Sequence, residues 1–221
     1  MYILLASATY NEINITAEWL RGLHGEVNGN EVEVLVTGIG SAITTYGLGK
    51  KIIRRRPDVI IQAGIGGSFK QELPPGSACF VDEEVFADLG AIDDGGFADI
   101  FDLGFADSND EPFHNRVLGN PYAERWKAFG LPFVRGATIN CISSTPDQAQ
   151  MIARKYDPAV ESMEGAALHY VCLMENIPFI QLRAVSNFVG ERNKRNWKLQ
   201  EAIAVLNEKL REMLLLAKLK S

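Results

Sequence analysis

Short apolar runs alternate along the chain with stretches of helical periodicity, which is typical of α/β proteins. We expect strands at 2–6, 32–37, 59–64, 78–86, 134–141, 159–163 and 179–186, with helices between several of them. In a last helix at about 197–219, apolar residues recur at spacings of three and four: Leu199, Ile203, Leu206, Leu210 and Met213. This face is expected to pack on the sheet as core and not to hold a cofactor.

The segment 88–120 departs from this alternation. It is rich in Gly and Asp, carries four phenylalanines and is too long for an ordinary connection. A disordered surface loop is one interpretation, but loops that carry aromatic residues usually pack them somewhere. We therefore favour an active-site lid or a dimer contact.

Composition narrows the possible classes of protein. With 221 residues and 47% hydrophobic content, the chain can bury one large core, and we expect a single domain over 1–221. The net charge of -6 and the lack of a basic patch with interleaved aromatics argue against a nucleic-acid partner. The N-terminus starts directly with a strand-like run, and no apolar run reaches membrane length. A cytoplasmic protein without a membrane partner is expected.

A metal site is not expected. Cys79, Cys141 and Cys172 lie in apolar surroundings without metal-ligand spacing, and the histidines are equally scattered. Buried, reduced thiols are the simpler interpretation of the three cysteines.

An isolated carboxylate, Glu164, stands where a predicted strand gives way to a helix that opens with Gly-Ala-Ala. Removing its charge from water costs several kcal/mol unless partners compensate. Its two acceptor oxygens suit a vicinal diol, such as the 2′ and 3′ hydroxyls of a ribose, and Met163 offers a soft apolar surface for the sugar. Alternatively, Glu164 sits in the first helical turn and favours the positive end of the helix. These residues alone leave both interpretations open.

Two glycine clusters, 38–40 and 64–67, each follow an apolar strand, as phosphate-cradling loops do. Neither completes a dinucleotide fingerprint, because Ile43 and Phe69 stand at the third glycine position, and no Lys-Ser/Thr pair follows to make a P-loop. The simpler interpretation is that these glycines turn the chain between strand and helix.

Two motifs carry a resemblance to a known family. Val160-Glu161-Ser162-Met163-Glu164-Gly165, followed later by Arg183-Ala184-Val185-Ser186-Asn187, resembles the nucleoside phosphorylase and nucleosidase superfamily. Within it, Asn187 and Val189-Gly190-Glu191-Arg192 are most similar to the futalosine hydrolase family. The similarity runs from Tyr2 to about Trp197 and is weakest between Asp88 and Pro121. It implies a nucleoside phosphorylase-like α/β domain with a central mixed twisted sheet flanked by helices, a homodimer or larger assembly, and no cofactor.

The resemblance also implies sugar-binding residues. In the superfamily the Met-Glu pair grips ribose, which gives this role to Met163 and Glu164. The second glycine cluster borders the nucleoside there, which adds Gly66 and Gly67. The segment 140–145 should flank the purine by analogy.

Phosphorylases of this superfamily hold phosphate with groups that are absent here. They carry an Arg two residues before the second glycine cluster and a Ser or Thr after its first glycine, where this chain has Gln62 and Ile65. A phosphate dianion in a water-poor site needs cationic, bidentate donors. The basic N-terminal phosphate loop is missing too, because residues 7–11 contain no arginine. Water is therefore the expected nucleophile.

The resemblance assigns the base and the leaving-group residue. Related nucleosidases keep a general base at the position of Glu12, although taken alone Glu12 is an ordinary first-turn helix residue. Asn187 is expected at the leaving purine, where its amide can accept from N7–H and donate to O6 of a 6-oxopurine. Adenosine-type nucleosidases carry Asp at this position, so Asn187 points to hypoxanthine, with Ser186 helping to position the amide. A structural Asn bonding the backbone is the alternative.

The benzoate end of futalosine would lie near 188–197. Phe188 and Trp197 would line it, with Trp197 as an apolar wall and Arg192 or Arg195 as the carboxylate partner. The competing interpretation is that the charged run 191–195 is a solvated loop.

The resemblance therefore implies an N-glycosyl hydrolase that cleaves futalosine to hypoxanthine and dehypoxanthinyl futalosine in menaquinone biosynthesis. A methylthioadenosine/S-adenosylhomocysteine-type nucleosidase is the alternative enzyme. A non-catalytic nucleoside-binding protein is the alternative from another class, since it would keep Glu164 but have no use for Glu12.

Overall fold

The computed structural model describes residues 1–93, 96–191 and 193–216. Most of its strands form one mixed sheet: β1 (Tyr2–Ser7), β2 (Glu26–Val27), β3 (Asn30–Val36), β4 (Val59–Ser68), β5 (Ala78–Phe86), β8 (Leu118–Gly119), β9 (Phe133–Thr138), β10 (Val160–Ser162) and β11 (Phe179–Phe188). The strands β6 (Gly90–Asp93) and β7 (Gly96–Asp99) pair with each other as a separate hairpin.

The large sheet folds back on itself. Its order is β10-β9-β5-β11-β4-β1-β3-β2, with β8 on β5, and β10 pairs with β4 as well as with β9. The strands β1, β3, β4 and β11 run parallel to their neighbours in this group, whereas β5 is antiparallel to β11 and β10 is antiparallel to β4. Because β10 joins two distant strands, β4, β11, β5, β9 and β10 close into a ring.

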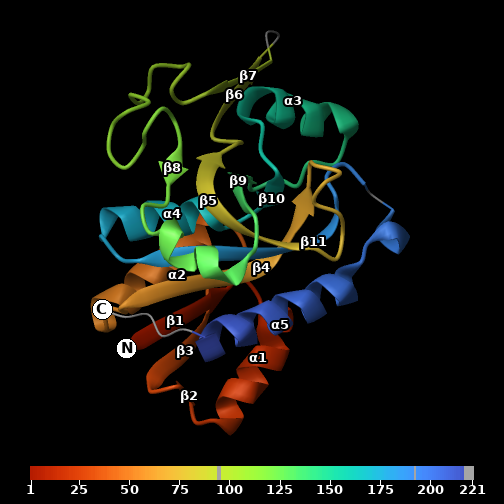
Figure 1. Cartoon of the computed structure of the whole chain (residues 1–221). Helices are drawn as coiled ribbons and strands as arrows, with labels where there is room; N and C mark the ends of the chain where they lie inside the picture. Colours follow the sequence, from red (N-terminus) through yellow and green to blue (C-terminus); the bar gives the residue numbers. More distant parts are fainter. Residues whose placement is uncertain (94–95, 192, 217–221) are drawn as a thin grey trace.

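Helices cover the sheet on two sides (Figure 1). They are α1 (Tyr10–Gly22), α2 (Ser41–Arg54), α3 (Pro146–Tyr156), α4 (Gly165–Met174) and α5 (Leu199–Leu216), with short 3-10 turns η1 (Ala123–Phe129) and η2 (Lys194–Asn196). The helices α1 and α5 lie side by side on one core, which includes Ile3, Ile13 and Leu210, whereas α2 and α4 pack on a second core around Leu4 and Leu168. The expected α/β architecture, with a central mixed sheet flanked by helices, is confirmed.

Three expectations about local structure were wrong. The second glycine cluster does not turn the chain, because β4 continues through it to Ser68. A Cβ at Gly66 would lie 2.7 Å from the carbonyl oxygen of Glu161, so glycine here permits the close approach of β10. The strand expected to reach Cys141 ends at Thr138, and Cys141 is exposed while the other two cysteines are buried.

The segment 88–120 contains the β6–β7 hairpin, which extends beside α3 in Figure 1. Two of its phenylalanines, Phe101 and Phe113, contact each other, and Phe113 also contacts Phe86 and Tyr170. In contrast, Phe105 is exposed. Part of the segment is therefore packed against the body of the protein.

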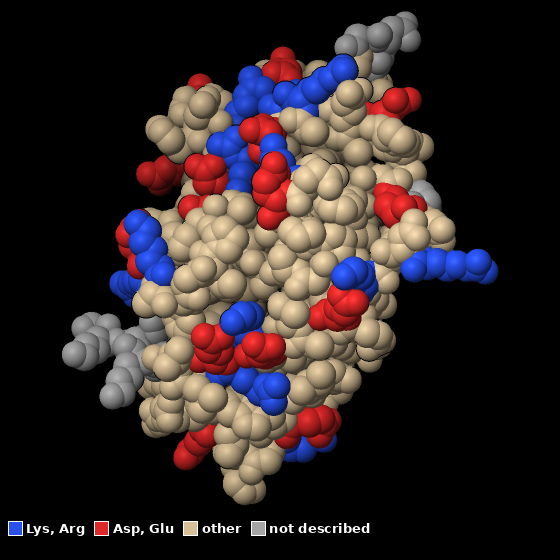
Figure 2. All heavy atoms as spheres, turned by 45° about the vertical axis from the view of Figure 1, so that its right-hand side comes forward, with Lys and Arg blue, Asp and Glu red and all other residues tan. Residues whose placement is uncertain are grey.

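Acidic and basic side chains are interspersed on the face shown in Figure 2. Several of the exposed or half-buried basic residues form salt bridges, among them Lys51 with Glu33 and Arg135 with Glu83. In the part of the chain that the structure describes, no helix is long and apolar enough to cross a membrane.

Candidate active site

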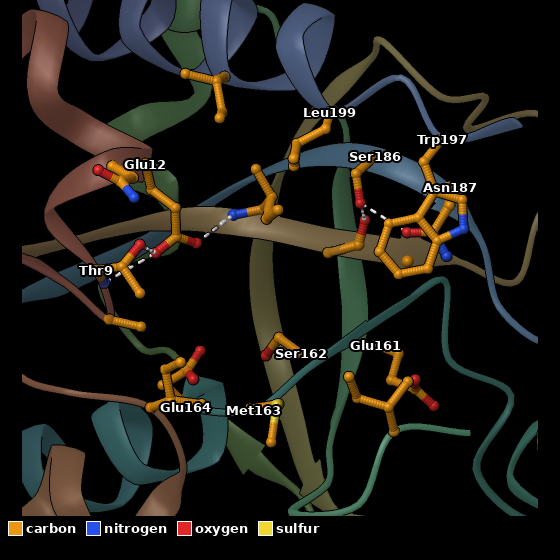
Figure 3. A pocket seen from close by; sticks show the side chains of 18 of the residues that line it. Thr9, Glu12, Glu161, Ser162, Met163, Glu164, Ser186, Asn187, Trp197 and Leu199 are labelled. Atoms are coloured by element: carbon orange, nitrogen blue, oxygen red, sulfur yellow. Dashed lines mark hydrogen bonds between the residues drawn. The ribbon is translucent and has the colours of Figure 1, made fainter. Parts of the chain in front are cut away.

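A cavity of about 340 Å³ opens where β1, β4, β10 and β11 end. Its walls bring together residues that are far apart in the sequence: Ala8, Thr9, Asn11, Glu12, Ile39, Ile65, Gly66, Gly67, Ile139, Ile142, Glu161, Ser162, Met163, Glu164, Ser186, Asn187, Trp197, Leu199 and Ile203. In Figure 3, Glu12 and Glu164 face each other at one end, while Asn187, Trp197 and Glu161 lie at the other. The cavity thus has two chemically distinct ends.

Glu12 is fixed by the corner between β1 and α1. Thr9 is the N-cap residue of α1, and its backbone N–H and Oγ1 donate to Glu12 Oε2 at 2.9 and 2.7 Å. The backbone N–H of Ile65 donates to Glu12 Oε1 at 3.0 Å. A carboxylate oxygen can accept more than one hydrogen bond, so Oε1 keeps capacity for a water in the cavity. Glu12 is therefore both a capping residue and a cavity residue.

Glu164 is held from two sides. It stands directly before α4, but its side chain does not cap that helix. Instead, Gly40 N–H donates to Glu164 Oε1 at 3.1 Å, and Arg183 Nη1 lies 3.5 Å from Oε2. Gly40 has a φ of 95°, which favours glycine, so the first glycine cluster supplies a backbone donor to this carboxylate. With a side chain only 6% exposed, Glu164 is charge-compensated and still borders the cavity.

Arg183 contacts two residues of the cavity wall, Ile65 and Glu164, and was not predicted as a site residue. Its guanidinium donates to Gln181 Oε1 at 2.8 Å through Nε and to Gln62 Oε1 at 3.0 Å through Nη2. A Cβ at Gly64 would lie 2.3 Å from Arg183 Nη1, so only glycine leaves room for the guanidinium. A signal was present in the sequence, because Gln181 and Arg183 alternate in an apolar strand and so share one face.

A further buried layer supports Gln181. Gln181 Nε2 donates to Glu84 Oε1 at 2.9 Å, and Thr138 Oγ1 donates to Glu84 Oε2 at 3.0 Å. Burial raises the pKa of Glu84 to about 7, although these hydrogen bonds and the charge of Arg183 lower it. His169 is also fully buried, and burial lowers its pKa to about 4. The groups that hold Glu164 thus belong to a buried polar network rather than to apolar core.

Asn187 and Ser186 form a unit at the other end. Ser186 Oγ donates to Asn187 Oδ1 at 2.7 Å, and Asn187 Nδ2 donates to the carbonyl of Phe188 at 2.9 Å. An amide oxygen has two lone pairs and an amide nitrogen two hydrogens, so each atom keeps one free position. The amide is therefore oriented by the protein and can still accept and donate one bond.

Glu161 lies at the same end as Asn187 (Figure 3) and is 6% exposed. Its Oε1 accepts from the backbone N–H of Ser143 at 3.3 Å. Burial raises the pKa of Glu161, and the charge of Asp88 adds to this, whereas the contact with Ser143 lowers it. The sequence around this carboxylate indicates no role for it.

Eight of the ten predicted site residues border the cavity: Glu12, Gly66, Gly67, Met163, Glu164, Ser186, Asn187 and Trp197. Phe188 is not among the lining residues, and Arg192 lies outside the described residues. Of the expected core face of α5, Leu206, Leu210 and Met213 are buried. The expectation for Leu199 and Ile203 was wrong, because both line the cavity.

The charge of the lining restricts the chemistry. Glu12, Glu161 and Glu164 line the cavity, and among the described residues no Lys, Arg or His does so. Such a site repels anions and favours a developing positive charge on a bound molecule.

Comparison with known proteins gives the family. The family model described as "Phosphorylase superfamily" matches residues 4–218. The futalosine hydrolase of Thermus thermophilus is 33% identical over 184 residues, which are 81% of this chain and 80% of that protein.

Two solved structures share the fold. The 5′-methylthioadenosine/S-adenosylhomocysteine nucleosidase of Colwellia psychrerythraea, in complex with adenine, has a TM-score of 0.80 at 18% identity, with 97% of this chain and 94% of that chain covered. The futalosine hydrolase of Helicobacter pylori has a TM-score of 0.75 at 17% identity, with 96% and 98% covered.

Proposed function

The chain belongs to the phosphorylase superfamily, and from this we propose that it is an N-glycosyl hydrolase that cleaves futalosine to hypoxanthine and dehypoxanthinyl futalosine. The observation that carries the hydrolytic assignment is the cavity lining, which has three carboxylates and, among the described residues, no cationic side chain. The futalosine hydrolase of Thermus thermophilus, at 33% identity, supports the choice of substrate. The product would then enter menaquinone biosynthesis.

Water is the nucleophile in this proposal. A phosphate dianion would meet the carboxylates of Glu12 and Glu164 without a lining cation to offset its charge. Two groups that stand at phosphate-binding positions are already engaged, because Ile65 N–H donates to Glu12 and Gln62 accepts from Arg183. Phosphorolysis is therefore disfavoured by the negative charge of the described lining.

Glu12 acts as the general base. Cleavage of an N-glycosidic bond passes through an oxocarbenium-like sugar, as in O-glycoside hydrolysis, and water attacks on the face opposite the departing base. Oε1 of Glu12 can bind and deprotonate that water while Oε2 stays fixed by Thr9. The two carboxylates at the sugar end also stabilise the positive charge that develops on the ring.

Glu164 holds the ribose. Its oxygens can accept from the 2′ and 3′ hydroxyls, while Gly40 and Arg183 keep the carboxylate in place. Met163, which also borders the cavity, provides an apolar contact for the sugar. This arrangement fixes C1′ between the water on Glu12 and the base at the opposite end.

Asn187 assists the leaving purine. Its free Oδ1 lone pair can accept from N7–H, and its free Nδ2 hydrogen can donate to O6, which is the pattern of a 6-oxopurine and not of adenine. Trp197 would face the 5′ extension, with Arg192 or Arg195 as partner for its carboxylate. Trp197 lines the cavity, which supports its part of this proposal.

A panel of nucleosides tests the function. Futalosine, aminodeoxyfutalosine, methylthioadenosine and S-adenosylhomocysteine are incubated separately with the protein, and the released base is followed by chromatography. We expect futalosine to have the highest kcat/KM and to yield hypoxanthine. Preferred release of adenine from methylthioadenosine would instead identify the alternative nucleosidase, and binding without release would identify a nucleoside-binding protein.

We also propose a homodimer or larger assembly that works in the cytoplasm. The outer side of α2 exposes Ile43, Tyr46 and Ile53, which supports a second copy packing there. The free cysteines fit a reducing compartment. Light scattering after size-exclusion chromatography measures the assembly, and a monomeric mass at working concentration would contradict it.

A further inference from the structure

The side chain of Glu161 has one buried oxygen that makes no hydrogen bond. Of the buried side-chain nitrogen and oxygen atoms in the described residues, Glu161 Oε2 is the one without a hydrogen-bond partner. Leaving a buried acceptor unpaired is costly, more so for a charged group. Because Glu161 lines the cavity and Oε1 is engaged by Ser143 N–H, the free oxygen is available to a bound ligand.

The sheet register places Glu161 opposite Asn187. Gly67 on β4 pairs with Glu161 on β10 on one side and with Asn187 on β11 on the other. Directly paired residues project to the same face of a sheet, and two strand spacings separate the outer residues by roughly 10 Å. The central residue has no side chain, so a flat ring can lie between the two polar groups. Figure 3 shows both side chains at this end of the cavity.

The protonation pattern of the base decides what Glu161 can bind. A 6-oxopurine carries a hydrogen on N1, whereas N1 of adenine has only a lone pair. The backbone N–H of Ser143 is a donor that would suit N1 of adenine, but it already donates to Glu161 Oε1. The atom left without a partner is Glu161 Oε2, which is an acceptor when the carboxylate is ionised. We propose that Glu161 is a specificity-determining residue that accepts the N1–H of a 6-oxopurine, next to the O6 and N7 positions assigned to Asn187.

This inference rests on the proposed function in assuming that the purine lies at the Asn187 end of the cavity. The competing explanation is that Glu161 only ties down the loop at Ser143. If Glu161 only holds the loop at Ser143 in place, its replacement should lower activity on all nucleosides equally. If Glu161 recognises N1–H, the loss of activity should depend on the base.

The variant Glu161→Gln separates the two explanations. Glutamine has one acceptor oxygen where glutamate has two. Its NH2 group must therefore face either N1–H of the 6-oxopurine or Ser143 N–H, and in both cases two donors oppose each other. With adenine the NH2 group can donate to the lone pair of N1. We expect the ratio of kcat/KM for futalosine to that for aminodeoxyfutalosine to fall about 10- to 100-fold.

Glu164→Gln is the matched control. It makes the same chemical change in a neighbouring carboxylate assigned to the sugar, so it should lower kcat/KM for both substrates alike and leave their ratio unchanged. An unchanged ratio in Glu161→Gln, with or without a general loss of activity, would overturn the role in base recognition.

Binding of free bases to the wild-type protein, measured by isothermal titration calorimetry, provides a test that needs neither a folded variant nor futalosine turnover. Hypoxanthine should bind at least about tenfold more tightly than 1-methylhypoxanthine, which has no hydrogen on N1. If futalosine is not cleaved but this preference holds, the substrate assignment fails and the recognition of N1–H stands. Equal affinity for the two bases, or tighter binding of adenine, would overturn the inference.

Discussion

Replacing Glu12 by glutamine tests the catalytic base while keeping its size. In the native corner, Oε2 accepts two hydrogen bonds from Thr9 and Oε1 accepts one from Ile65 N–H. The amide oxygen of glutamine can replace Oε2, but its NH2 group would then face the Ile65 N–H without an acceptor. One unsatisfied donor in this half-buried corner costs about 1–3 kcal/mol of folding free energy. For a chain of this size the Tm should fall by roughly 2–12 °C.

The catalytic effect should be separate and larger. Loss of a general base lowers kcat by about 10²-fold or more, which corresponds to at least about 2.7 kcal/mol in the barrier. Because glutamine leaves the sugar and base contacts intact, KM should change little. Steady-state rates of hypoxanthine release from futalosine, measured well below the lowered Tm, give both quantities.

Thr9→Ala is the control for the structural role of the corner. It removes the N-cap side chain and one hydrogen bond to Glu12, which costs about 0.5–2 kcal/mol of stability. Because the carboxylate remains, kcat should stay within a few-fold of wild type. Near-normal turnover in a folded Glu12→Gln protein would remove Glu12 from the mechanism. An equally large loss of kcat in Thr9→Ala would mean that the corner, and not the base, limits the rate.

Three further outcomes are expected. Asn187→Asp should lower kcat/KM for futalosine by about 1–3 kcal/mol in transition-state stabilisation and spare aminodeoxyfutalosine, since ionised Asp has no hydrogen for O6; an unchanged ratio between the two substrates would show that Asn187 does not read the base. The pKa of His169 is lowered to about 4, so its protonation lowers the free energy of unfolding of the protein as pH falls below about 6.5. The pKa of Glu84 is raised to about 7, so its protonation raises that free energy as pH falls below about 7. These two effects oppose each other, and Glu84→Gln removes the favourable one. Lowering the pH from 7.5 to 5 should therefore change the free energy of unfolding, measured with urea, less favourably by about 2–3 kcal/mol in Glu84→Gln than in wild type; an equal change in both proteins would contradict this. Cys141 is exposed and the other cysteines are buried, so a thiol reagent should modify one thiol in the native protein and all three after denaturation; rapid native modification of all three would contradict the burial.

The sequence predicted the sugar end of the site through short motifs. Met163 and Glu164 are adjacent, and the strand that precedes them was visible as an apolar run, so their position at a strand-to-helix corner followed from local pattern. Glu12 needed the family resemblance, because the sequence around it reads as an ordinary helix start. The structure shows why both interpretations arose, since Glu12 completes a capping box and also faces the cavity.

The groups that hold these residues depend on pairings between distant strands. Arg183 meets Glu164 only because β11 lies beside β4, where Gly64 leaves space for the guanidinium. The alternation of Gln181 and Arg183 could have indicated a buried polar row. By contrast, the role of Gly40 as a donor to Glu164 had no local signal, because it requires α2 and α4 to begin at the same edge of the sheet.

The errors also have physical causes. The continuation of β4 through Gly66 and Gly67 was missed because glycine usually ends a strand, whereas here it allows β10 to pack closely. The apolar face of α5 was correctly assigned to core at Leu206, but its first turn reaches past the sheet, so Leu199 contributes to the cavity wall. Periodicity gives the face of a helix and not where the underlying sheet ends.

The fate of C1′ of the sugar tests the central claim most directly. Futalosine is incubated with the protein in ¹⁸O-labelled water, once with inorganic phosphate in excess and once without phosphate, and the sugar product is analysed by mass spectrometry. We expect hypoxanthine release at the same rate in both reactions, with one ¹⁸O atom in dehypoxanthinyl futalosine. Formation of a sugar 1-phosphate, or a rate that requires phosphate, would contradict hydrolysis by a water held on Glu12.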